Sequence, residues 1–444
     1  MKKYFGTDGI RGKFGNELGF DLAYKLGYIF ANEFKNIKIL IGRDTRFSGH
    51  FLSLAFSCGA MQCGAKIVDV GICPTAGISF LTKKLGFDYG VVISASHNPA
   101  EYNGIKIFDS KGLKLSDDKE NLLEQKLLQN IKINFSQIGE YELNLSLLDE
   151  YTNYLSSTFD FCFYGKKLVL DCANGSTSKI ADKIFRDKGA EVILIGASPN
   201  GKNINQECGC VNIENLRQGV LKNNADLGFA FDGDGDRLIV VDKSGAVVDG
   251  DKIVYIFSCY LKEQGKLKNQ VVVGTKHTNM GVEIALKNRG IKLIRTDIGD
   301  KFVGRKIRGV GAVLGGEQSG HIILNEIMPT GDGNLSALFL SFILMTENKT
   351  ISSYLDFEDF CQVNINIEVS DKNEIIKNKQ LCDFLKEKES VLNDFGRVLI
   401  RASGTESCIR IMVETQSESV SKKIANEFAE VIQQIDGKLK KCVE

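Results

Sequence analysis

The chain has 444 residues, and division by about 150 residues per domain gives about three domains, although four small ones would also fit. Its 56 Lys and Arg residues balance its 56 Asp and Glu residues, which argues against a general nucleic-acid binder because such proteins usually carry a basic excess. A small anionic ligand stays open, since it needs only a local cluster of donors. The 45 glycines exceed the usual share of about 7% and indicate many tight loops.

The twelve cysteines raise the question of disulfide bonds or a zinc site. The start of the chain, Met1-Lys2-Lys3, leads into a segment without an apolar h-region, and there is no Cys-x-x-Cys pair. We therefore expect reduced, buried cysteines in a cytoplasmic protein. The longest apolar run, near residues 335–345, is too short to span a bilayer, so we expect no membrane partner.

Short β-branched runs alternate with longer helical stretches along the chain, which is typical of α/β proteins. The first part predicts strands at 37–41 and 89–94, helices at 51–64 and 119–130, and a connecting helix at 145–157. The pattern repeats twice more, with elements at 167–170, 178–188, 191–195, 227–231, 270–273, 280–287, 292–295 and 311–314. The end differs, because strands at 396–400 and 408–414 precede one amphipathic helix at 419–435.

This organisation predicts three related α/β domains and a small α+β domain. Their expected ranges are 1–150, 151–250, 251–360 and 361–444. Each domain carries one polar loop at the end of a strand, where ligands gather in open α/β sheets. Four domains that each contribute one loop to a shared central cleft are the simplest arrangement that uses all four loops.

The strongest chemical signal is the loop Asp232-Gly-Asp234-Gly-Asp236-Arg237. Carboxylates at every second position can converge on a hard cation, and the glycines let the backbone fold tightly around it. An EF-hand fails here, because Arg237 and Lys243 stand where that loop needs Gly and Glu. Oxygen ligands in this number suit Mg²⁺. A solvated acidic turn is the alternative, although apolar runs lie on both sides.

A second loop, Ser94-Ala-Ser96-His97-Asn98-Pro99, follows the strand predicted at 89–94. By itself a Ser-His pair in such a turn fits capping and turn chemistry. A serine hydrolase would need the Gly-x-Ser-x-Gly elbow, which is absent around Ser96. With a metal loop elsewhere in the chain, the pair instead indicates phosphoryl chemistry, in which Ser96 holds a phosphoryl ester.

Two more loops suit a sugar and a phosphate. Glu317 and Ser319, between glycines, can hydrogen-bond vicinal sugar hydroxyls, and a hydrophilic turn is the alternative. The segment 401–406 with Arg410 offers hydroxyls, backbone amides and guanidiniums for a phosphate dianion, again with a plain turn as the alternative. Arg11 adds a further Gly-framed cation. No Walker A loop and no Gly-x-Gly-x-x-Gly dinucleotide loop is present.

Five motifs in this order resemble the α-D-phosphohexomutase superfamily over nearly the whole chain. They are Phe-Gly-Thr-Asp-Gly-Ile-Arg-Gly, Ser-Ala-Ser-His-Asn-Pro, Asp-Gly-Asp-Gly-Asp-Arg, Gly-Glu-Gln-Ser-Gly-His and Arg-Ala-Ser-Gly-Thr-Glu. The forms at 315–321, 298–301 and 330–333 look most like the bacterial branch that acts on amino-sugar phosphates. The resemblance implies the four-domain phosphohexomutase architecture around a central cleft. Ala402, Ser407 and residues 275–279 depart from the common pattern, and Lys301 stands where Arg is usual.

The resemblance also implies a phosphosugar mutase that interconverts glucosamine 6-phosphate and glucosamine 1-phosphate through a bisphosphorylated sugar and supplies the precursor of UDP-N-acetylglucosamine. Ser96 would carry the phosphoryl group and, with Asp232, Asp234 and Asp236, hold one Mg²⁺ per active site. Lys106 and His97 would handle protons, and Arg237 would offset charge. The expected substrate contacts are Arg11, Lys301, Glu317, Ser319, His321, Arg401, Ser403, Gly404, Thr405 and Arg410.

Two other functions stay open at this point. One is a phosphomannomutase or phosphoglucomutase of the same superfamily, and the other is a non-catalytic Mg²⁺-dependent sugar-phosphate binding protein. The expected partner is a small amino-sugar phosphate, and no nucleic acid is expected. A homodimer is an expectation that rests on the family analogy alone.

Overall fold

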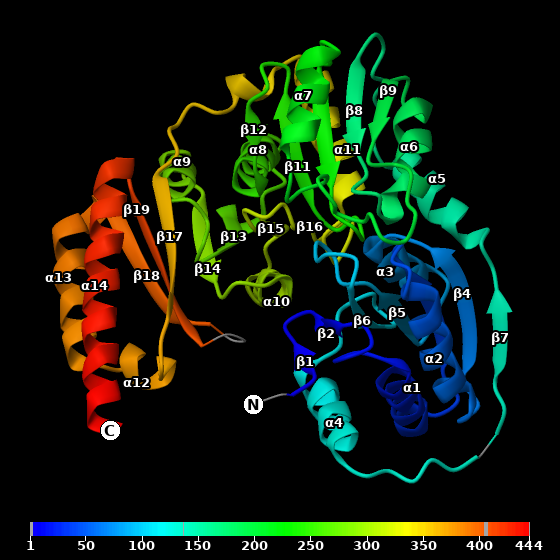
Figure 1. Cartoon of the computed structure of the whole chain (residues 1–444). Helices are drawn as coiled ribbons and strands as arrows, with labels where there is room; N and C mark the ends of the chain where they lie inside the picture. The colour runs from blue at the N-terminus through cyan, green and yellow to red at the C-terminus, as the bar shows by residue number, and fades with distance from the viewer. Residues whose placement is uncertain (1–2, 136, 404–406, 444) are drawn as a thin grey trace. The chain divides into compact units, whose positions relative to one another are not determined.

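The computed structural model describes residues 3–135, 137–403 and 407–443. Within them the strands form four sheets, of seven, five, four and three strands in chain order. The chain divides into two compact units: Met1–His277 with Ile291–Tyr354, and Thr278–Gly290 with Leu355–Glu444. The first unit contains the three larger sheets, and the second contains the three-stranded sheet (Figure 1).

The seven-stranded sheet has the order β1-β2-β6-β5-β3-β4-β7. Its strands are β1 (Phe5–Gly6), β2 (Gly9–Lys13), β3 (Lys38–Arg43), β4 (Lys66–Ile72), β5 (Tyr89–Ile93), β6 (Tyr102–Asp109) and β7 (Glu140–Leu143). The helices of this region are α1 (Phe20–Phe34), α2 (Gly49–Met61), α3 (Thr75–Lys84) and α4 (Asp117–Leu128). Ile39 and Ile41 join the core with α1 and α2, whereas Gly42 lies against Ile78 of α3. Because neighbouring side chains on a strand point to opposite faces, helices cover both faces of β3.

The five-stranded sheet has the order β12-β11-β10-β8-β9. Its strands are β8 (Lys167–Asp171), β9 (Glu191–Ile195), β10 (Leu227–Phe231), β11 (Leu238–Asp242) and β12 (Val247–Val248). The helices before and within this region are α5 (Leu147–Thr158), η1 (Ser176–Lys179), α6 (Ala181–Asp187) and α7 (Glu214–Lys222). All five residues of β10 are buried, so the loop that follows it starts from the centre of the sheet.

The four-stranded sheet has the order β14-β13-β15-β16. Its strands are β13 (Val271–Thr275), β14 (Lys292–Thr296), β15 (Leu314–Gly316) and β16 (Ile322–Leu324). The helices of this region in the first unit are α8 (Gly250–Glu263), η2 (Lys268–Gln270), α10 (Asp300–Val310), α11 (Gly333–Glu347) and η3 (Ile351–Ser353). Asp249 and Asp332 cap α8 and α11 by accepting hydrogen bonds from backbone amides of the first turn.

The second unit has the strand order β17-β19-β18. Its elements are α9 (Met280–Asn288), β17 (Cys361–Glu368), α12 (Lys372–Ile376), α13 (Lys379–Leu392), η4 (Asn393–Phe395), β18 (Gly396–Ala402), β19 (Cys408–Thr415) and α14 (Glu418–Val443). Ile409, Ile411 and Val413 on β19 pack in one core with Phe428 and Ile432 of α14. Helices α13 and α14 lie side by side on this sheet (Figure 1).

Most predicted elements lie within a few residues of the observed ones. The strand expected at 311–314 is an exception, because α10 continues to Val310 and ends at Gly311, which has a left-handed φ of 66°. Strand β15 therefore begins at Leu314. The apolar run near 335–345 forms the buried helix α11, and none of the described helices is long and apolar enough to cross a membrane. The domain boundaries near 150, 250 and 360 stay predictions.

Candidate active site

The loop after β5 presents Ser96 to the loop after β10. Ser96 is buried, and its Oγ donates a hydrogen bond to Asp232 Oδ2 at 2.5 Å. The two residues are 136 positions apart in the sequence, and each follows the carboxyl end of a strand. The loop expected to carry a phosphoryl group and the loop expected to bind metal therefore meet in the first unit.

The three aspartates expected to bind metal are buried together. One carboxylate oxygen from each of Asp232, Asp234 and Asp236 lies within 4.8 Å of the others. Asp234 Oδ1 and Asp236 Oδ1 are buried and accept no hydrogen bond within the described part of the chain. Burial, together with the charges of Asp236 and Asp234, holds the pKa of Asp232 well above its ordinary value. A divalent cation would relieve this repulsion and give the two oxygens a partner, so the residues fit a hard metal ion.

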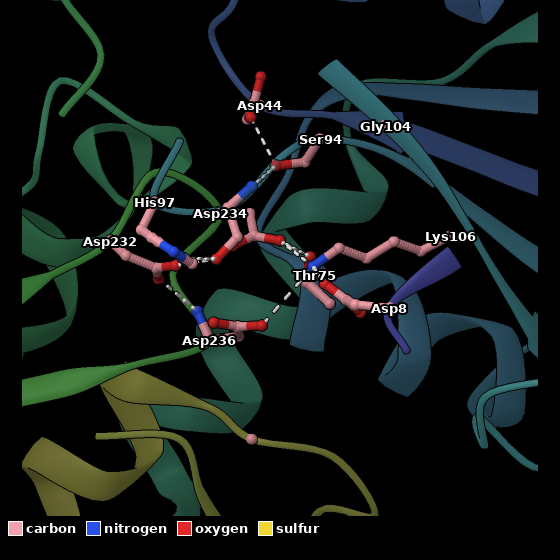
Figure 2. A network of polar contacts seen from close by, with 12 residues as sticks. Asp8, Asp44, Thr75, Ser94, His97, Gly104, Lys106, Asp232, Asp234 and Asp236 are labelled. Carbon is pink, nitrogen blue, oxygen red and sulfur yellow. Dashed lines mark hydrogen bonds and ion pairs between the residues drawn. The ribbon is translucent and has the colours of Figure 1, made fainter. Parts of the chain in front are cut away.

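Lys106 on β6 reaches these carboxylates from the first sheet. Its Nζ lies 2.8 Å from Asp234 Oδ2 and 2.9 Å from Asp8 Oδ2, and its side chain is almost fully buried (Figure 2). Thr75, at the start of α3, donates to the same Asp234 oxygen at 2.6 Å. Burial disfavours the charged amine, but Asp234 and Asp8 outweigh it and hold the pKa of Lys106 well above its ordinary value.

Asp8 is one member of a closed network of alternating charges. It also pairs with Lys114, which pairs with Asp300 at the start of α10. Asp300 Oδ2 lies 3.8 Å from His321 Nε2, and His321 Nδ1 lies 3.5 Å from Asp236 Oδ2. Asp236 closes the ring, because its Oδ2 lies 3.7 Å from Lys106 Nζ. The network, which we call the charge ring, therefore joins the first and third sheets through side chains of opposite sign.

His97 lies beside the hydroxyl of Ser96, and the charges of two arginines act on His97. His97 Nδ1 lies 3.4 Å from Ser96 Oγ. Burial, with the charges of Arg237 and Arg11, lowers the pKa of His97 to about 4, so its ring is neutral near pH 7. The Nη1 of Arg11 donates to Asn98 Oδ1 at 3.0 Å, and Arg237 Nε is buried 3.9 Å from Asp236 Oδ1. This side of the site is thus cationic.

The loop between β15 and β16 adds Glu317, Ser319 and His321. Leu238 donates its backbone amide to Gly320 O at 3.0 Å, which fixes this loop beside the metal loop. Glu317 is largely buried, and its Oε1 accepts from the backbone amide of Gly299 at 2.9 Å. Burial raises the pKa of Glu317 although the charge of His321 opposes the shift.

Some of these groups line a cavity of about 420 Å³, whereas Ser96, Lys106, Asp232 and Asp234 are not in its lining. Its walls combine the first motif, the serine loop, the metal loop and the sugar loop, through Gly6, Thr7, Asp8, Gly9, Arg11, His97, Asp236, Arg237, Ile298, Gly299, Asp300, Glu317, Ser319 and His321. Lys301, which was expected to contact substrate, is not part of this lining. Its Nζ pairs instead with Asp117 Oδ1 and Glu120 Oε2, both at 2.6 Å, beside α4.

The predicted phosphate loop lies in the second unit. Arg401 on β18 is in register with Arg410 on β19, and the Nη2 of Arg410 donates to Ser403 Oγ at 3.4 Å. Burial and the neighbouring charge of Arg410 lower the pKa of Arg401. Gly404 and Thr405 lie outside the described residues. The loop therefore brings together at least two guanidiniums and a hydroxyl.

Family models built from known proteins match the segments of the chain that carry these loops. Family models for phosphoglucomutase/phosphomannomutase α/β/α domains I, II and III match residues 2–133, 149–245 and 249–360, and the model for the C-terminal domain matches residues 365–431. The chain belongs to the phosphoglucomutase/phosphomannomutase family. The resemblance drawn from the motifs is thereby confirmed, as are the four-domain fold and the class of enzyme, an isomerase of the mutase type.

Relatives that match nearly the whole chain carry the name phosphoglucosamine mutase. Phosphoglucosamine mutases from Geobacillus kaustophilus and Clostridioides difficile are each 43% identical to this chain and cover 97% and 98% of it, respectively, with 98% and 99% of their own lengths. The phosphoglucosamine mutase of Bacillus subtilis is 41% identical over 97% of this chain and 98% of its own length.

Solved structures share the fold at lower identity. A phosphoglucomutase/phosphomannomutase family protein from Burkholderia thailandensis superposes with a TM-score of 0.81 at 23% identity, covering 98% of both chains. The N-acetylphosphoglucosamine mutase of Aspergillus fumigatus, in complex with GlcNAc-6P and magnesium, superposes with a TM-score of 0.67 at 17% identity, covering 98% of this chain and 96% of its own. At these identities the likeness shows the fold alone.

Several residues at the site were not predicted from the sequence. Asp8 and Asp300 stand inside motifs that were recognised, next to glycines, and their charge was a signal that could have been used. Lys114 and Thr75 lie in segments with no such signal, and only the folded chain brings them to the aspartates. The same holds for Arg46 and Asn205, which contact the backbone of the serine loop.

Proposed function

We propose that this chain interconverts glucosamine 6-phosphate and glucosamine 1-phosphate. The observation that carries the proposal is the contact of Ser96 Oγ with Asp232, beside a cavity that contains Glu317 and Ser319. A phosphorylatable hydroxyl, a buried carboxylate cluster and sugar-binding side chains are then within one site. The activity for which the 41–43% identical relatives are named supports the choice of an amino sugar.

The proposed reaction has two transfers. In the first, the bond between phosphorus and Ser96 Oγ breaks, and a new bond forms from phosphorus to the free hydroxyl of the sugar phosphate. The hydroxyl proton passes to a base of the site, and the serine oxygen is protonated. The bisphosphorylated sugar then turns in the cavity and returns its other phosphoryl group to Ser96, with the proton transfers reversed.

We assign proton transfer to His97 and Lys106, because both lie close to Ser96 or to the metal loop. His97 Nδ1 lies 3.4 Å from Ser96 Oγ, and Lys106 Nζ lies 2.8 Å from Asp234 on the adjoining loop. Arg237 and Arg11 line the same cavity and offset negative charge on the transferring group.

One Mg²⁺ would be held by Asp232, Asp234 and Asp236 together with an oxygen of phospho-Ser96. The two buried carboxylate oxygens without partners support this assignment. When bound, the ion neutralises charge on the phosphoryl oxygens. Glu317 and Ser319 would bind sugar hydroxyls with His321 nearby, while Arg401, Ser403, Gly404, Thr405 and Arg410 would bind the phosphate that does not react.

Two measurements test the proposal. Intact-mass spectrometry of the purified protein should find one phosphate, which peptide mapping places on Ser96, and the Ser96→Ala variant should lose mutase activity in Mg²⁺. The Ser110→Ala variant is the matched control, because Ser110 is an exposed serine at the opposite end of the sheet, where Asp109 pairs with Tyr89. Full activity in Ser96→Ala would refute the proposed carrier.

Two other functions give different results in the same assays. A phosphomannomutase or phosphoglucomutase would turn over mannose or glucose phosphates faster than glucosamine phosphates. A sugar-phosphate binding protein would bind all or some of these without interconversion, and it would have no use for a phosphate on Ser96.

We further propose a cytoplasmic homodimer. Phe20, Phe47 and Phe51 are each nearly half exposed. Phe14 contacts Phe47 and Phe51, and Phe51 contacts Phe20, so these rings form an apolar patch at the start of α1 and around the start of α2 that a second copy could cover. Light scattering should give twice the chain mass, and Phe47→Ser with Phe51→Ser should give the monomer. Tyr164→Ser, at an exposed site elsewhere, should leave the dimer intact.

A further inference from the structure

The backbone of the serine loop is held in a conformation that a serine rarely adopts. Ser96 has a φ of 53°, in the left-handed region that favours glycine. Such a conformation persists only where surrounding contacts over-determine it. The contacts around Ser96 therefore show what fixes the direction of its Oγ.

Arg46, on the segment after β3, bonds to carbonyls of the serine loop, to the first residue of β6 and to Asp44. Its Nη2 donates to Ser96 O at 2.9 Å and to Asn98 O at 2.7 Å. Its Nη1 donates to Tyr102 O at 2.9 Å and to Pro99 O, and its Nε donates to Asp44 Oδ2 at 2.9 Å. A guanidinium has five N–H donors, and these five contacts give each donor an acceptor. The Arg46 side chain is fully buried.

Asp44 is linked to the backbone amide of Ser96 through the side chain of Ser94. Its Oδ2 also accepts from Ser94 Oγ at 2.5 Å (Figure 2). Ser94 Oγ in turn accepts from the Ser96 amide at 2.9 Å. Both the amide and the carbonyl of Ser96 are therefore tied to the Arg46–Asp44 pair. A residue with both backbone groups fixed has little freedom to leave the left-handed region.

Asn205, on the segment between β9 and α7, donates to the carbonyls of Ser96 and Asn98, to which Arg46 also donates. Its Nδ2 donates to Ser96 O at 2.9 Å and to Asn98 O at 3.0 Å. Gly233 of the metal loop lies against this junction, since a Cβ there would come within 2.6 Å of Ser96 O and 3.0 Å of Asn205 Nδ2. Asn205 thus sets the position of the serine loop relative to the loop that bears Asp232 and Asp234.

We propose that Arg46 and Asn205 are positioning residues that hold the phosphoryl-carrying serine in register with the metal loop. Each of the carbonyls of Ser96 and Asn98 accepts from both side chains, so neither can rotate without losing two hydrogen bonds. Neither residue is placed to touch the reacting atoms. This inference rests on the proposed function, in which Ser96 carries the phosphoryl group.

The chemistry of the two side chains predicts which replacements fail. The Arg46→Lys change would keep the charge but replace the planar guanidinium by a compact ammonium group. One ammonium could not bond the carbonyls of Ser96, Asn98, Pro99 and Tyr102 together. Alanine at position 205 would leave Ser96 O and Asn98 O with one donor each from Arg46. Both changes should misplace Ser96 Oγ, and a misplaced nucleophile lowers kcat more than it changes substrate binding.

The test compares Asn205→Ala and Arg46→Lys with wild type in full-length protein with Mg²⁺. We expect kcat to fall about tenfold in Asn205→Ala and about a hundredfold in Arg46→Lys, with KM within about twofold. The rate at which glucose 1,6-bisphosphate loads phosphate on Ser96, followed by intact mass, should fall by the same factors.

Two matched variants separate positioning from general damage. Asn203→Ala changes the same loop as Asn205, but the Asn203 side chain bonds to that loop's own backbone, at Ser198 and Asn200. Arg43→Lys changes a neighbouring arginine that pairs with Asp69. We expect both to keep wild-type kcat. Asn205 provides an independent test if Arg46→Lys fails to fold.

The outcomes distinguish this inference from the proposed function. Wild-type kcat and loading rate in a folded Asn205→Ala protein would overturn the inference, as would an equal loss in Asn203→Ala. An inactive wild-type protein that never gains phosphate on Ser96 would overturn the proposed function instead.

Discussion

Replacing Asp8 by asparagine removes one charge from the charge ring while keeping the size of the side chain. At an effective dielectric constant of about 20, two unit charges separated by the 2.9 Å between Asp8 Oδ2 and Lys106 Nζ attract by about 6 kcal/mol before desolvation is counted. Lys106 keeps Asp234 at 2.8 Å, Lys114 keeps Asp300, and the Asp8 side chain is 18% exposed, so only part of this energy is lost. We expect the first unit to lose about 2–4 kcal/mol of stability.

Thermal unfolding at pH 7 and low salt measures the change. A loss of this size should lower the midpoint of the first unit, which is larger than 300 residues, by about 3–6 °C. The matched control is Asp182→Asn, which breaks an exposed pair with Arg186 on one helix and should shift the midpoint by about 1 °C or less.

A double-mutant cycle with Lys114→Met shows whether the ring acts as a unit. Asp8 and Lys114 are in direct contact, so the double variant should lose less stability than the two single variants added together, by about 1–3 kcal/mol. Additive effects would refute the reasoning. So would an Asp8→Asn protein whose thermal midpoint equals that of the Asp182→Asn control.

Three further predictions follow from other parts of the structure. Burial raises the pKa of Asp332 to about 6 from an ordinary 3.8, although the Leu335 amide and the Tyr151 hydroxyl oppose the shift. The folded state then binds the extra proton, so wild-type stability should fall by about 3 kcal/mol as pH rises from about 4 to 6, and thermal melts of Asp332→Asn should lack this component. Removing Mg²⁺ with a chelator should lower the thermal midpoint of wild type, with recovery on adding Mg²⁺, whereas Asp234→Asn should show no such response. In the second unit, Arg410→Gln should raise the substrate KM about tenfold or more, while Lys422→Gln on α14 should leave it unchanged, and equal KM values would count against the phosphate loop.

The chemistry of the loops was readable from the sequence because it depends on residues close together in the chain. Ser96, the three aspartates and Glu317 each follow a short β-branched or apolar run, and the carboxyl ends of such strands are where an α/β sheet binds its ligands. Side-chain types at spacings of two residues were enough to predict a hard metal ion. The order of five motifs then gave the family, because chance agreement over nearly the whole chain is improbable.

The partners of those residues were decided by the tertiary structure alone. Ser96 meets Asp232 across 136 residues, and Lys106 meets Asp234 across 128, which depends on how separate sheets pack. Lys301 carried the right charge for a substrate contact, yet the N-terminal turn of α4 offers Asp117 and Glu120 at 2.6 Å and binds it there. Asn205 lacked any motif of its own, and its role depends on two carbonyls more than a hundred residues away. Local pattern determines what a residue can do, and long-range packing determines which groups are within its reach.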